Sequence, residues 1–255
     1  MITTTSEFKY PRRRLIRATL QALSRLAFAI LADFHIEGRE NFPKRGPLII
    51  VGNHFSFIDP VALVRVSPWP LEFIGGFVNP SAPPIVTWIP RAWGFYPVFR
   101  GTASRLALRA SEAVLNQGGV LAIFPEGGSW ATVLRPARPG AAYVATRTGA
   151  PILPIGYDGL PELFPQLRRG KRARVTVRIG KPFGPFSVEG RGQERRAQLD
   201  EIGHTIMRKI KELIPPERHG CYSDDPATRE AARGTEIYPW DTATETDFRS
   251  GELLD

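Results

Sequence analysis

Apolar and polar positions along the middle of the chain predict strands and helices in alternation. Short apolar runs, typical of buried strands, cover residues 48–51, 71–77, 120–124, 151–157 and 172–180. Apolar positions at helical spacing occupy residues 60–66, 104–117, 140–148 and 194–214. Because strands that alternate with helices build a sheet covered on both faces, this order predicts a single α/β domain with a mixed, mostly parallel central sheet flanked by helices.

A helix is also predicted near the N-terminus, where apolar residues form one narrow stripe at 3.6-residue spacing. The stripe consists of Ile16, Leu20, Leu23, Ala27, Ile30 and Phe34. Arg14, Gln21 and Arg25 lie near the opposite side. Two readings are open: the stripe packs on the domain, or it rests among lipid headgroups, where apolar burial and the attraction of arginine to anionic lipid add together.

The chain divides by character into three regions. Residues 1–40 are predicted to be an amphipathic membrane-docking region, 41–215 the catalytic domain and 216–255 a polar, acidic extension. The net charge is +9, but from residue 221 onward nine acidic and three basic residues give −6, so the rest carries +15. A body this basic attracts polyanions: nucleic acid, anionic lipid, or phosphorylated and coenzyme A substrates. With one cysteine, Cys221, no internal disulfide can form.

The first candidate chemistry follows the apolar run at residues 48–51. His54 comes after this predicted strand, and Asp59 lies five residues later, across a turn and before Pro60. Histidine, with a reference pKa of about 6.5, can remove a proton from a hydroxyl near neutrality, and a carboxylate can orient the ring and stabilise the imidazolium. In the competing interpretation, Asp59 merely caps a helix and His54 is a buried structural residue.

Two further segments carry polar groups beside apolar ones. Residues 94–100, GFYPVFR, form an aromatic segment that ends in the cation Arg100, suited to a headgroup phosphate beside an acyl chain. Residues 124–128, FPEGG, place Glu126 on a glycine-rich turn after a strand, where it could bind hydroxyls or order the loop. Taken singly, each is also compatible with a surface charge or a turn residue.

The order NHFSFID, GFYPVFR, FPEGG, PILPIGY over residues 53–157 resembles the four sequence blocks of the glycerolipid acyltransferase family, whose best-known members are the 1-acylglycerol-3-phosphate O-acyltransferases. The resemblance implies that His54 is the general base and Asp59 its orienting partner. It further implies a set of substrate-binding residues, namely Asn53, Ser56, Arg100, Glu126, Gly127 and Arg138. The family usually has Thr and Arg after its Pro-Glu-Gly core, whereas this chain has Gly128 and Ser129.

The function implied by the resemblance is transfer of a fatty acyl group from acyl-CoA or acyl carrier protein to a hydroxyl of a lysophosphatidic acid-like acceptor, in phospholipid biosynthesis. No metal or bound cofactor is expected, and the expected partners are a lipid surface, the acyl donor and the lysolipid, without nucleic acid. The expected location is the cytoplasmic face of the cell membrane, as a peripheral or monotopic protein, since no apolar run approaches the roughly 20 residues of a spanning helix.

Several alternatives stay open at this stage. The acceptor can instead be another lysophospholipid, a glycolipid or an ornithine-type lipid, which the Gly128-Ser129 departure invites, or the chain can be a lipid binder without activity. A nucleic-acid-binding module would explain the basic body, but no recognition helix or zinc-finger motif is present. A serine hydrolase using Ser56 or Ser129 is disfavoured because neither lies in G-x-S-x-G.

Overall fold

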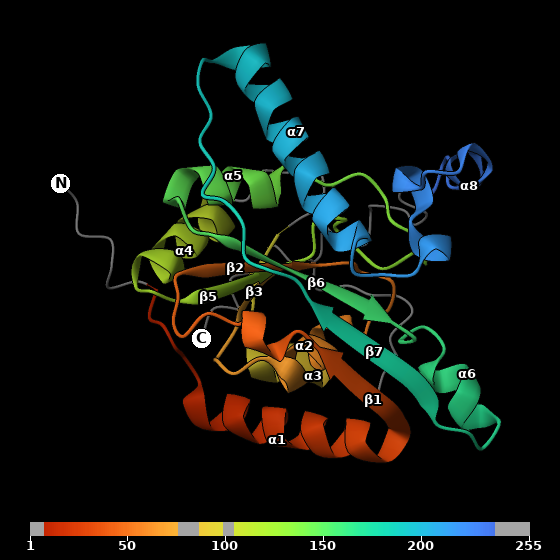
Figure 1. The fold of residues 1–255 in the computed structure, drawn as a ribbon. Helices are drawn as coiled ribbons and strands as arrows, with labels where there is room; N and C mark the ends of the chain where they lie inside the picture. Colours follow the sequence, from red (N-terminus) through yellow and green to blue (C-terminus); the bar gives the residue numbers. More distant parts are fainter. Residues whose placement is uncertain (1–7, 76–86, 99–104, 238–255) are drawn as a thin grey trace.

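A computed structural model describes residues 8–75, 87–98 and 105–237 of the protein. Within these residues a seven-stranded sheet runs through the centre in the order β1-β7-β6-β2-β5-β3-β4 (Figure 1). Neighbouring strands are parallel except β6 and β7, which are antiparallel. The predicted fold class, an α/β domain with a mixed and mostly parallel sheet, is confirmed.

Apolar side chains on both faces of the sheet form two core clusters. In the central strand, Leu48 and Ile50 join one cluster while Ile49 and Val51 join the other, because successive side chains of a strand point to opposite faces. The strands are β1 (Ala32–Glu37), β2 (Leu48–Gly52), β3 (Glu72–Gly75), β4 (Tyr96–Pro97), β5 (Val120–Ile123), β6 (Ile152–Asp158) and β7 (Ala173–Ile179).

The helices form a layer on each side of the sheet (Figure 1). One face is covered by α1 (Arg14–Leu31), α2 (Asp59–Val66), α3 (Trp88–Trp93) and α6 (Leu163–Arg168). The other face is covered by α4 (Arg105–Asn116), α5 (Gly140–Thr148) and α7 (Gly192–Lys211). Short helical turns complete the described chain: η1 (Arg39–Asn41), η3 (Pro216–Arg218), η4 (Gly220–Tyr222) and α8 (Pro226–Ala231). Backbone hydrogen bonds from Leu134 to Arg218 and from Cys221 to Leu134 attach the residues that follow α7 to the rest of the described fold.

The predicted elements correspond closely to those observed. Five strands and four helices fall where the apolar patterns placed them, as β2, β3, β5, β6 and β7 and as α2, α4, α5 and α7. Residues 76, 77 and 104, which were included in these predictions, lie outside the described part of the chain. The short elements β4, α3 and α6 were not predicted, because segments of two to six residues are too short for a periodic pattern to emerge.

Phe34 was expected on the N-terminal helix but lies on a strand. The helix ends at Leu31, and Ala32 is already extended, with φ −136° and ψ 153°. Residues 32–37 then pair in parallel with 173–178 of β7. Ala32, Phe34 and Ile36 also alternate, so this short stretch fits both a helical and a strand period, and pairing with β7 decides between them.

Helix α1 turns its apolar stripe away from the protein. Its inward face is formed by the buried residues Arg17, Ser24 and Phe28. Five large apolar side chains are instead exposed, namely Leu15, Ile16, Leu23, Leu26 and Ile30. The reading in which the stripe packs on the domain is therefore wrong for most of its positions. No helix in the described residues combines the length and apolarity needed to cross a membrane.

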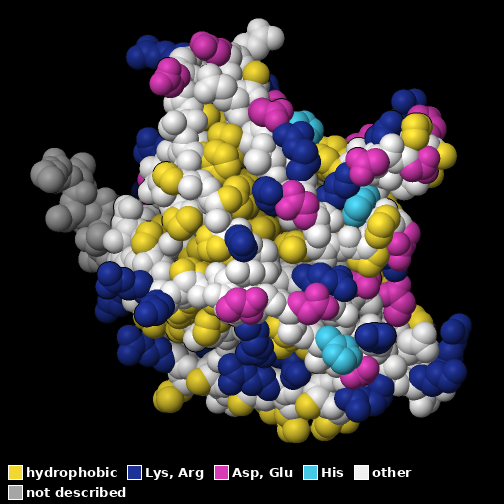
Figure 2. Space-filling view, viewed as in Figure 1, with side chains coloured by type: hydrophobic (Ala, Val, Ile, Leu, Met, Phe, Trp, Pro, Cys, Tyr) yellow, Lys and Arg dark blue, Asp and Glu magenta, His cyan; other side chains and the backbone are white. Residues whose placement is uncertain are grey.

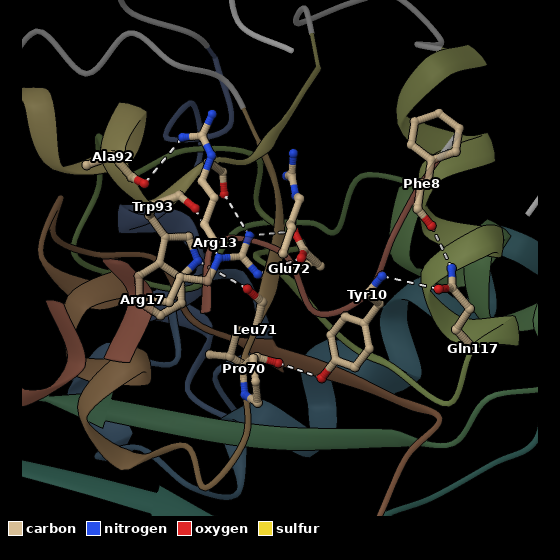
Figure 3. A network of polar contacts seen from close by, with 12 residues as sticks. Phe8, Tyr10, Arg13, Arg17, Pro70, Leu71, Glu72, Ala92, Trp93 and Gln117 are labelled. Atoms are coloured by element: carbon tan, nitrogen blue, oxygen red, sulfur yellow. Dashed lines mark hydrogen bonds and ion pairs between the residues drawn. The ribbon is translucent and has the colours of Figure 1, made fainter. Parts of the chain in front are cut away.

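A buried ionic cluster explains this orientation of α1 (Figure 3). Arg17 forms two hydrogen bonds with the Glu72 carboxylate, at 2.5 and 2.8 Å, and a third with the carbonyl of Trp93 at 3.0 Å. Arg12 adds a bond of 2.9 Å to the same carboxylate, which is fully buried. Just before the helix, Tyr10 donates its hydroxyl to the carbonyl of Pro70. The polar face of α1 therefore packs against the rest of the protein, and its apolar face is exposed.

Candidate active site

The candidate catalytic residues lie where parallel strands end side by side. Strand β2 has β5 on one side and β6 on the other, and all three run in the same direction. The chain leaves β2 into His54, β5 into Glu126, and β6 ends next to Tyr157. In open α/β sheets, ligands commonly bind outside the carboxyl ends of the parallel strands. The sequence blocks containing His54 and Glu126 therefore meet in space.

His54 and Asp59 form a hydrogen-bonded pair. Nδ1 of His54 lies 2.9 Å from Oδ2 of Asp59, and the same oxygen accepts the backbone N–H of Ser56 at 2.8 Å. Asp59 opens α2 and is fully buried, whereas 14% of the His54 side chain is exposed. The imidazole stacks on Phe124, with ring centroids 4.4 Å apart. The geometry agrees with the predicted pairing and leaves one edge of the histidine accessible.

Burial determines the electrostatics of this pair. Removing Asp59 from water raises its pKa above the ordinary value, although the bond to His54 and backbone N–H groups of the loop oppose that rise. A buried carboxylate of this kind is stabilised when a positive charge forms beside it. Asp59 is therefore suited to stabilise His54 in the imidazolium form.

Glu126 holds the loops around His54 together. Its Oε1 accepts the backbone N–H of His54 at 2.8 Å. Its Oε2 accepts both the backbone N–H and the Nε–H of Arg135, at 3.3 and 3.1 Å. The carboxylate is 1% exposed, and burial raises its pKa to about 7, while Arg135 acts in the opposite direction. Of the two roles considered for Glu126, these contacts favour ordering the loop over binding an acceptor hydroxyl.

Arg135 is also committed to the protein. It is 1% exposed, donates to the carbonyl of Gly128, and lies over the ring of Trp130 with its guanidinium carbon 3.8 Å from the centroid. A side chain so placed cannot bind an acceptor phosphate without rearrangement. Its link to Glu126 was not anticipated from sequence, where nine residues separate the two.

Asn53 connects the end of β2 to the end of β6. Its side-chain amide donates to the carbonyl of Tyr157 at 2.9 Å, and its side-chain oxygen accepts the Tyr157 N–H at 2.8 Å. It is completely buried, and this pair of bonds continues the pairing of the strands one step beyond Gly52. The polar groups of Asn53 are thus used within the protein, although the sequence suggested contact with substrate.

The remaining predicted site residues differ in their placement. Gly127 is exposed and takes φ +77°, a conformation that favours glycine, and a side chain there would approach Arg138. Arg138 is exposed and lies beside this turn, where its backbone N–H donates to the carbonyl of Pro125 at 2.7 Å. Ser56 is buried in the loop between His54 and Asp59. Arg100 lies outside the described residues.

The comparisons with known proteins agree with this fold and site. Residues 33–158 match the Acyltransferase family model, which spans β1 to β6 and includes His54, Asp59 and Glu126. The crystal structure of the 1-acyl-sn-glycerophosphate (LPA) acyltransferase PlsC from Thermotoga maritima is similar, with a TM-score of 0.54 and 28% identity, covering 79% of this chain and 81% of that one. The resemblance noted in the sequence is confirmed, and residues 33–158 form an acyltransferase-family domain.

Two curated relatives are named for the same activity. A 1-acyl-sn-glycerol-3-phosphate acyltransferase of Chlamydomonas reinhardtii is 29% identical, covering 78% of this chain and 59% of its own length. The chloroplastic 1-acyl-sn-glycerol-3-phosphate acyltransferase LPAT1 of Arabidopsis thaliana is 31% identical over 66% of this chain and 48% of its own length. The chain thus spans about half to two thirds of these relatives.

Proposed function

We propose that the protein transfers a fatty acyl group from a thioester donor to the hydroxyl of a 1-acylglycerol-3-phosphate-like acceptor. One observation carries the proposal: the 2.9 Å bond between His54 Nδ1 and buried Asp59, at the edge of the sheet where the family blocks meet. Because Asp59 holds Nδ1, Nε2 is the nitrogen that can receive a proton from an acceptor hydroxyl. The names of the relatives and of the Thermotoga maritima structure support the choice of acceptor.

The chemistry assigned to these residues is a direct transfer without an acyl-enzyme. The acceptor hydroxyl gives its proton to His54 Nε2 while its oxygen bonds to the thioester carbonyl carbon, and the carbonyl oxygen becomes an oxyanion. Asp59 stabilises the imidazolium that forms. When the oxyanion collapses, the carbon–sulfur bond breaks and the thiolate leaves, taking the proton from His54 to become a free thiol. The acceptor thus becomes an ester, and the base returns to its starting state.

Acceptor recognition is proposed to involve two cations, Arg138 and Arg100. Arg138 lies beside Gly127, so its guanidinium is near the loop held by Glu126, and such a group can bind a phosphate through two parallel hydrogen bonds. Arg100 is proposed as the second cation, by its place in the family pattern. Because Gly128 and Ser129 replace the usual Thr and Arg, other lysophospholipids, glycolipids and ornithine-type lipids are the acceptors to compare.

The decisive test measures thiol release from acyl-CoA and from acyl carrier protein in the presence of lysophosphatidic acid, each alternative acceptor, or none. His54→Ala should lower the rate by a factor of about 10² to 10⁴, because a general base contributes that much. The matched control is His204→Ala, which removes an exposed histidine on α7 and should leave the rate unchanged. Turnover that survives in His54→Ala would remove this residue from the mechanism, and no turnover with any pair of substrates would favour a lipid binder.

The location proposed for the protein is the cytoplasmic face of the cell membrane, with α1 lying in the headgroup layer. The exposed apolar side chains of this helix line the lower edge of the molecule, with basic side chains beside them (Figure 2). At the C-terminal end of α1, Arg172 donates to the carbonyls of Ala29 and Ala32. Four more cations flank it in and after α6, namely Arg168, Arg169, Lys171 and Arg174. Each Lys or Arg near an anionic membrane contributes about 1 kcal/mol, which adds to the apolar burial.

Vesicle binding tests this location separately from activity. The double variant Leu23→Asn/Leu26→Asn should bind vesicles of mixed anionic and neutral phospholipid about 10-fold or more weakly, since it removes two exposed leucines from the contact. Ile237→Asn is the matched control, because this residue is equally apolar and exposed but lies outside α1. Equal binding by the double variant and the wild-type protein would exclude α1 as the docking element. Vesicle binding that does not depend on the fraction of anionic lipid would exclude a role for the arginines.

A further inference from the structure

Two buried polar atoms behind the histidine form no hydrogen bond with any residue that the structure describes. They are Oδ1 of Asp59, the carboxylate oxygen that does not contact His54, and the phenolic oxygen of Tyr157. Asp59 is 0% exposed and Tyr157 is 2% exposed. Buried polar atoms are almost always hydrogen-bonded in folded proteins, directly or through an ordered water, so two exceptions beside one candidate site require an explanation.

Tyr157 reaches this place from the end of β6. Its backbone is fixed by the two hydrogen bonds with Asn53, the residue before His54. Its ring lies against Gly52, so closely that a side chain at that glycine would come within 2.6 Å of the ring. Gly52 is therefore needed to admit the tyrosine, which brings an aromatic side chain under the loop that carries His54.

Tyr157 and the helix that begins with Asp59 pack together on the same side of the sheet. The tyrosine belongs to the apolar cluster that contains Ile58, Ala62 and Leu63 of the segment starting α2, and Asp59 is the first residue of that helix. The Tyr157 ring is also 6.4 Å from that of Phe124, which stacks on His54. A donor and an acceptor without other described partners thus lie within one buried cluster around the histidine.

The two groups are complementary as a hydrogen-bond donor and an acceptor. Burial, followed by the negative charge of Asp59, raises the pKa of Tyr157 well above its ordinary value, so the phenol keeps its proton and can act as a donor. Asp59 Oδ1 can only accept while the carboxylate is ionised. The other ionisable groups that face this carboxylate are His54 and Glu126, and both already have hydrogen-bond partners.

We propose that Tyr157 is a positioning residue for the His54–Asp59 pair, and that its hydroxyl donates to Asp59 Oδ1 through one buried water molecule. The proposal rests on the proposed function for its catalytic consequence. A water needs two or more polar partners to remain in a protein interior, and these two atoms provide an acceptor and a donor. The bridge fixes the second carboxylate oxygen, so that the first stays directed at Nδ1 of His54.

The test is Tyr157→Phe, which removes one oxygen without changing the shape of the ring. The expected result is a fall in kcat of about 10- to 100-fold, the size of effect expected when a charged group loses a hydrogen bond, with little change in KM for donor or acceptor. The acid limb of the pH–rate profile should move to higher pH, because Asp59 becomes more basic when a donor is lost. A purely structural role would not move this limb. Tyr143→Phe, the same change on α5, is the control and should resemble the wild-type protein.

A second readout does not depend on turnover. The ring of His54 is titrated by NMR in the wild-type protein, in Tyr157→Phe and in Asp59→Asn. Tyr157→Phe should shift the His54 titration, and the same change made in the Asp59→Asn background should shift it no further, since the tyrosine acts only through Asp59. This double comparison also applies if Tyr157→Phe loses stability, as long as the variants remain folded at the temperature used.

The outcomes separate the two proposals. A shifted His54 titration in a protein that is inactive with every acceptor would support the positioning role and contradict the proposed function. An active protein in which Tyr157→Phe changes neither kcat, nor the acid limb, nor the His54 titration would overturn the positioning role. A shift that persists undiminished in the Asp59→Asn background would also overturn it, because the tyrosine would then act by another route.

Discussion

Two fully buried glutamates lie at opposite ends of neighbouring strands, and they are held in different ways. Glu72 begins β3, opposite Leu121 of β5, and its carboxylate is surrounded by the guanidinium groups of Arg12 and Arg17. Glu126 follows the other end of β5 and has one arginine, Arg135, together with backbone N–H groups. One carboxylate fixes the helix that we propose to dock on lipid, and the other fixes the loop that carries His54.

The two carboxylates differ in the number of cations that contact them. Two cations share the charge of Glu72, and the cluster joins α1, β3 and the end of α3 into one unit. Glu126 has a single cation, and burial raises its pKa to about 7. The hold of Glu126 on the loop that carries His54 is therefore expected to change with pH in the neutral range.

The largest effect is expected from breaking the anchor on one side only. Arg17→Met should lower the free energy of unfolding by about 3–5 kcal/mol, because it leaves the Glu72 carboxylate buried with only the partly exposed Arg12 as a charged partner. Chemical denaturation followed by circular dichroism would measure the change. The double variant Arg17→Met/Glu72→Leu removes both charges and should recover much of the loss, since replacing a buried pair with apolar residues is often neutral. Equal losses in the two variants would mean that packing, not charge, dominates.

A smaller effect, on activity rather than on folding, is expected at Glu126. In Glu126→Gln the amide nitrogen must face either the His54 N–H or Arg135, so one of these donors loses its acceptor, and a loss of about 10-fold in kcat follows from one weakened hydrogen bond to a positioned group. Glu112→Gln on α4 is the matched control for the side-chain change. Wild-type rates in Glu126→Gln would show that the carboxylate is dispensable.

The raised pKa of Glu126 predicts opposite pH dependences for activity and stability. Activity should fall as pH drops through about 7, because protonation weakens the hold on His54, and the fall should be less steep in Glu126→Gln. For stability, the folded-state pKa lies above the unfolded value of 4.5, so the contribution is complete below that value and is lost as pH rises through about 7. Unfolding measured from pH 4 to 8 in both proteins would detect it, and identical curves would contradict it.

The sequence was sufficient to predict a contact between candidate residues where these residues lie close along the chain. His54 and Asp59 are five residues apart across one turn, and their spacing alone suggested the pairing that the structure contains. The sheet was predictable for the same reason, because each apolar run is local and its period is visible. The boundary between helix and strand near Ala32 was not predictable. The short alternation there fits both a helical and a strand period, and the partner strand β7 that decides between them is distant along the chain.

The supporting contacts could not be predicted, because they join residues far apart and carry no pattern of their own. Nothing in the sequence links Arg17 with Glu72, which are 55 positions apart, or Asn53 with Tyr157, which are 104 apart. Asn53 and Glu126 were assigned to substrate because motifs record which residue types recur, not which of their atoms are already bonded. The orientation of α1 was ambiguous for a related reason, as its polar face meets a buried glutamate that belongs to another element.

The smallest effect is expected for an arginine–glutamate ion pair that lies on the surface. Arg147 and Glu112 connect α5 to α4 with a bond of 3.0 Å, close to the distances in the Glu72 cluster, but about half of the arginine side chain is exposed. In water the attraction is screened and the side chains lose conformational freedom, so such pairs contribute roughly 0–1 kcal/mol. Glu112→Gln should therefore shift the unfolding midpoint far less than Arg17→Met under the same conditions. A comparable shift would mean that burial is not what distinguishes the anchor of α1, and the contrast between the two buried glutamates would then need a different physical basis.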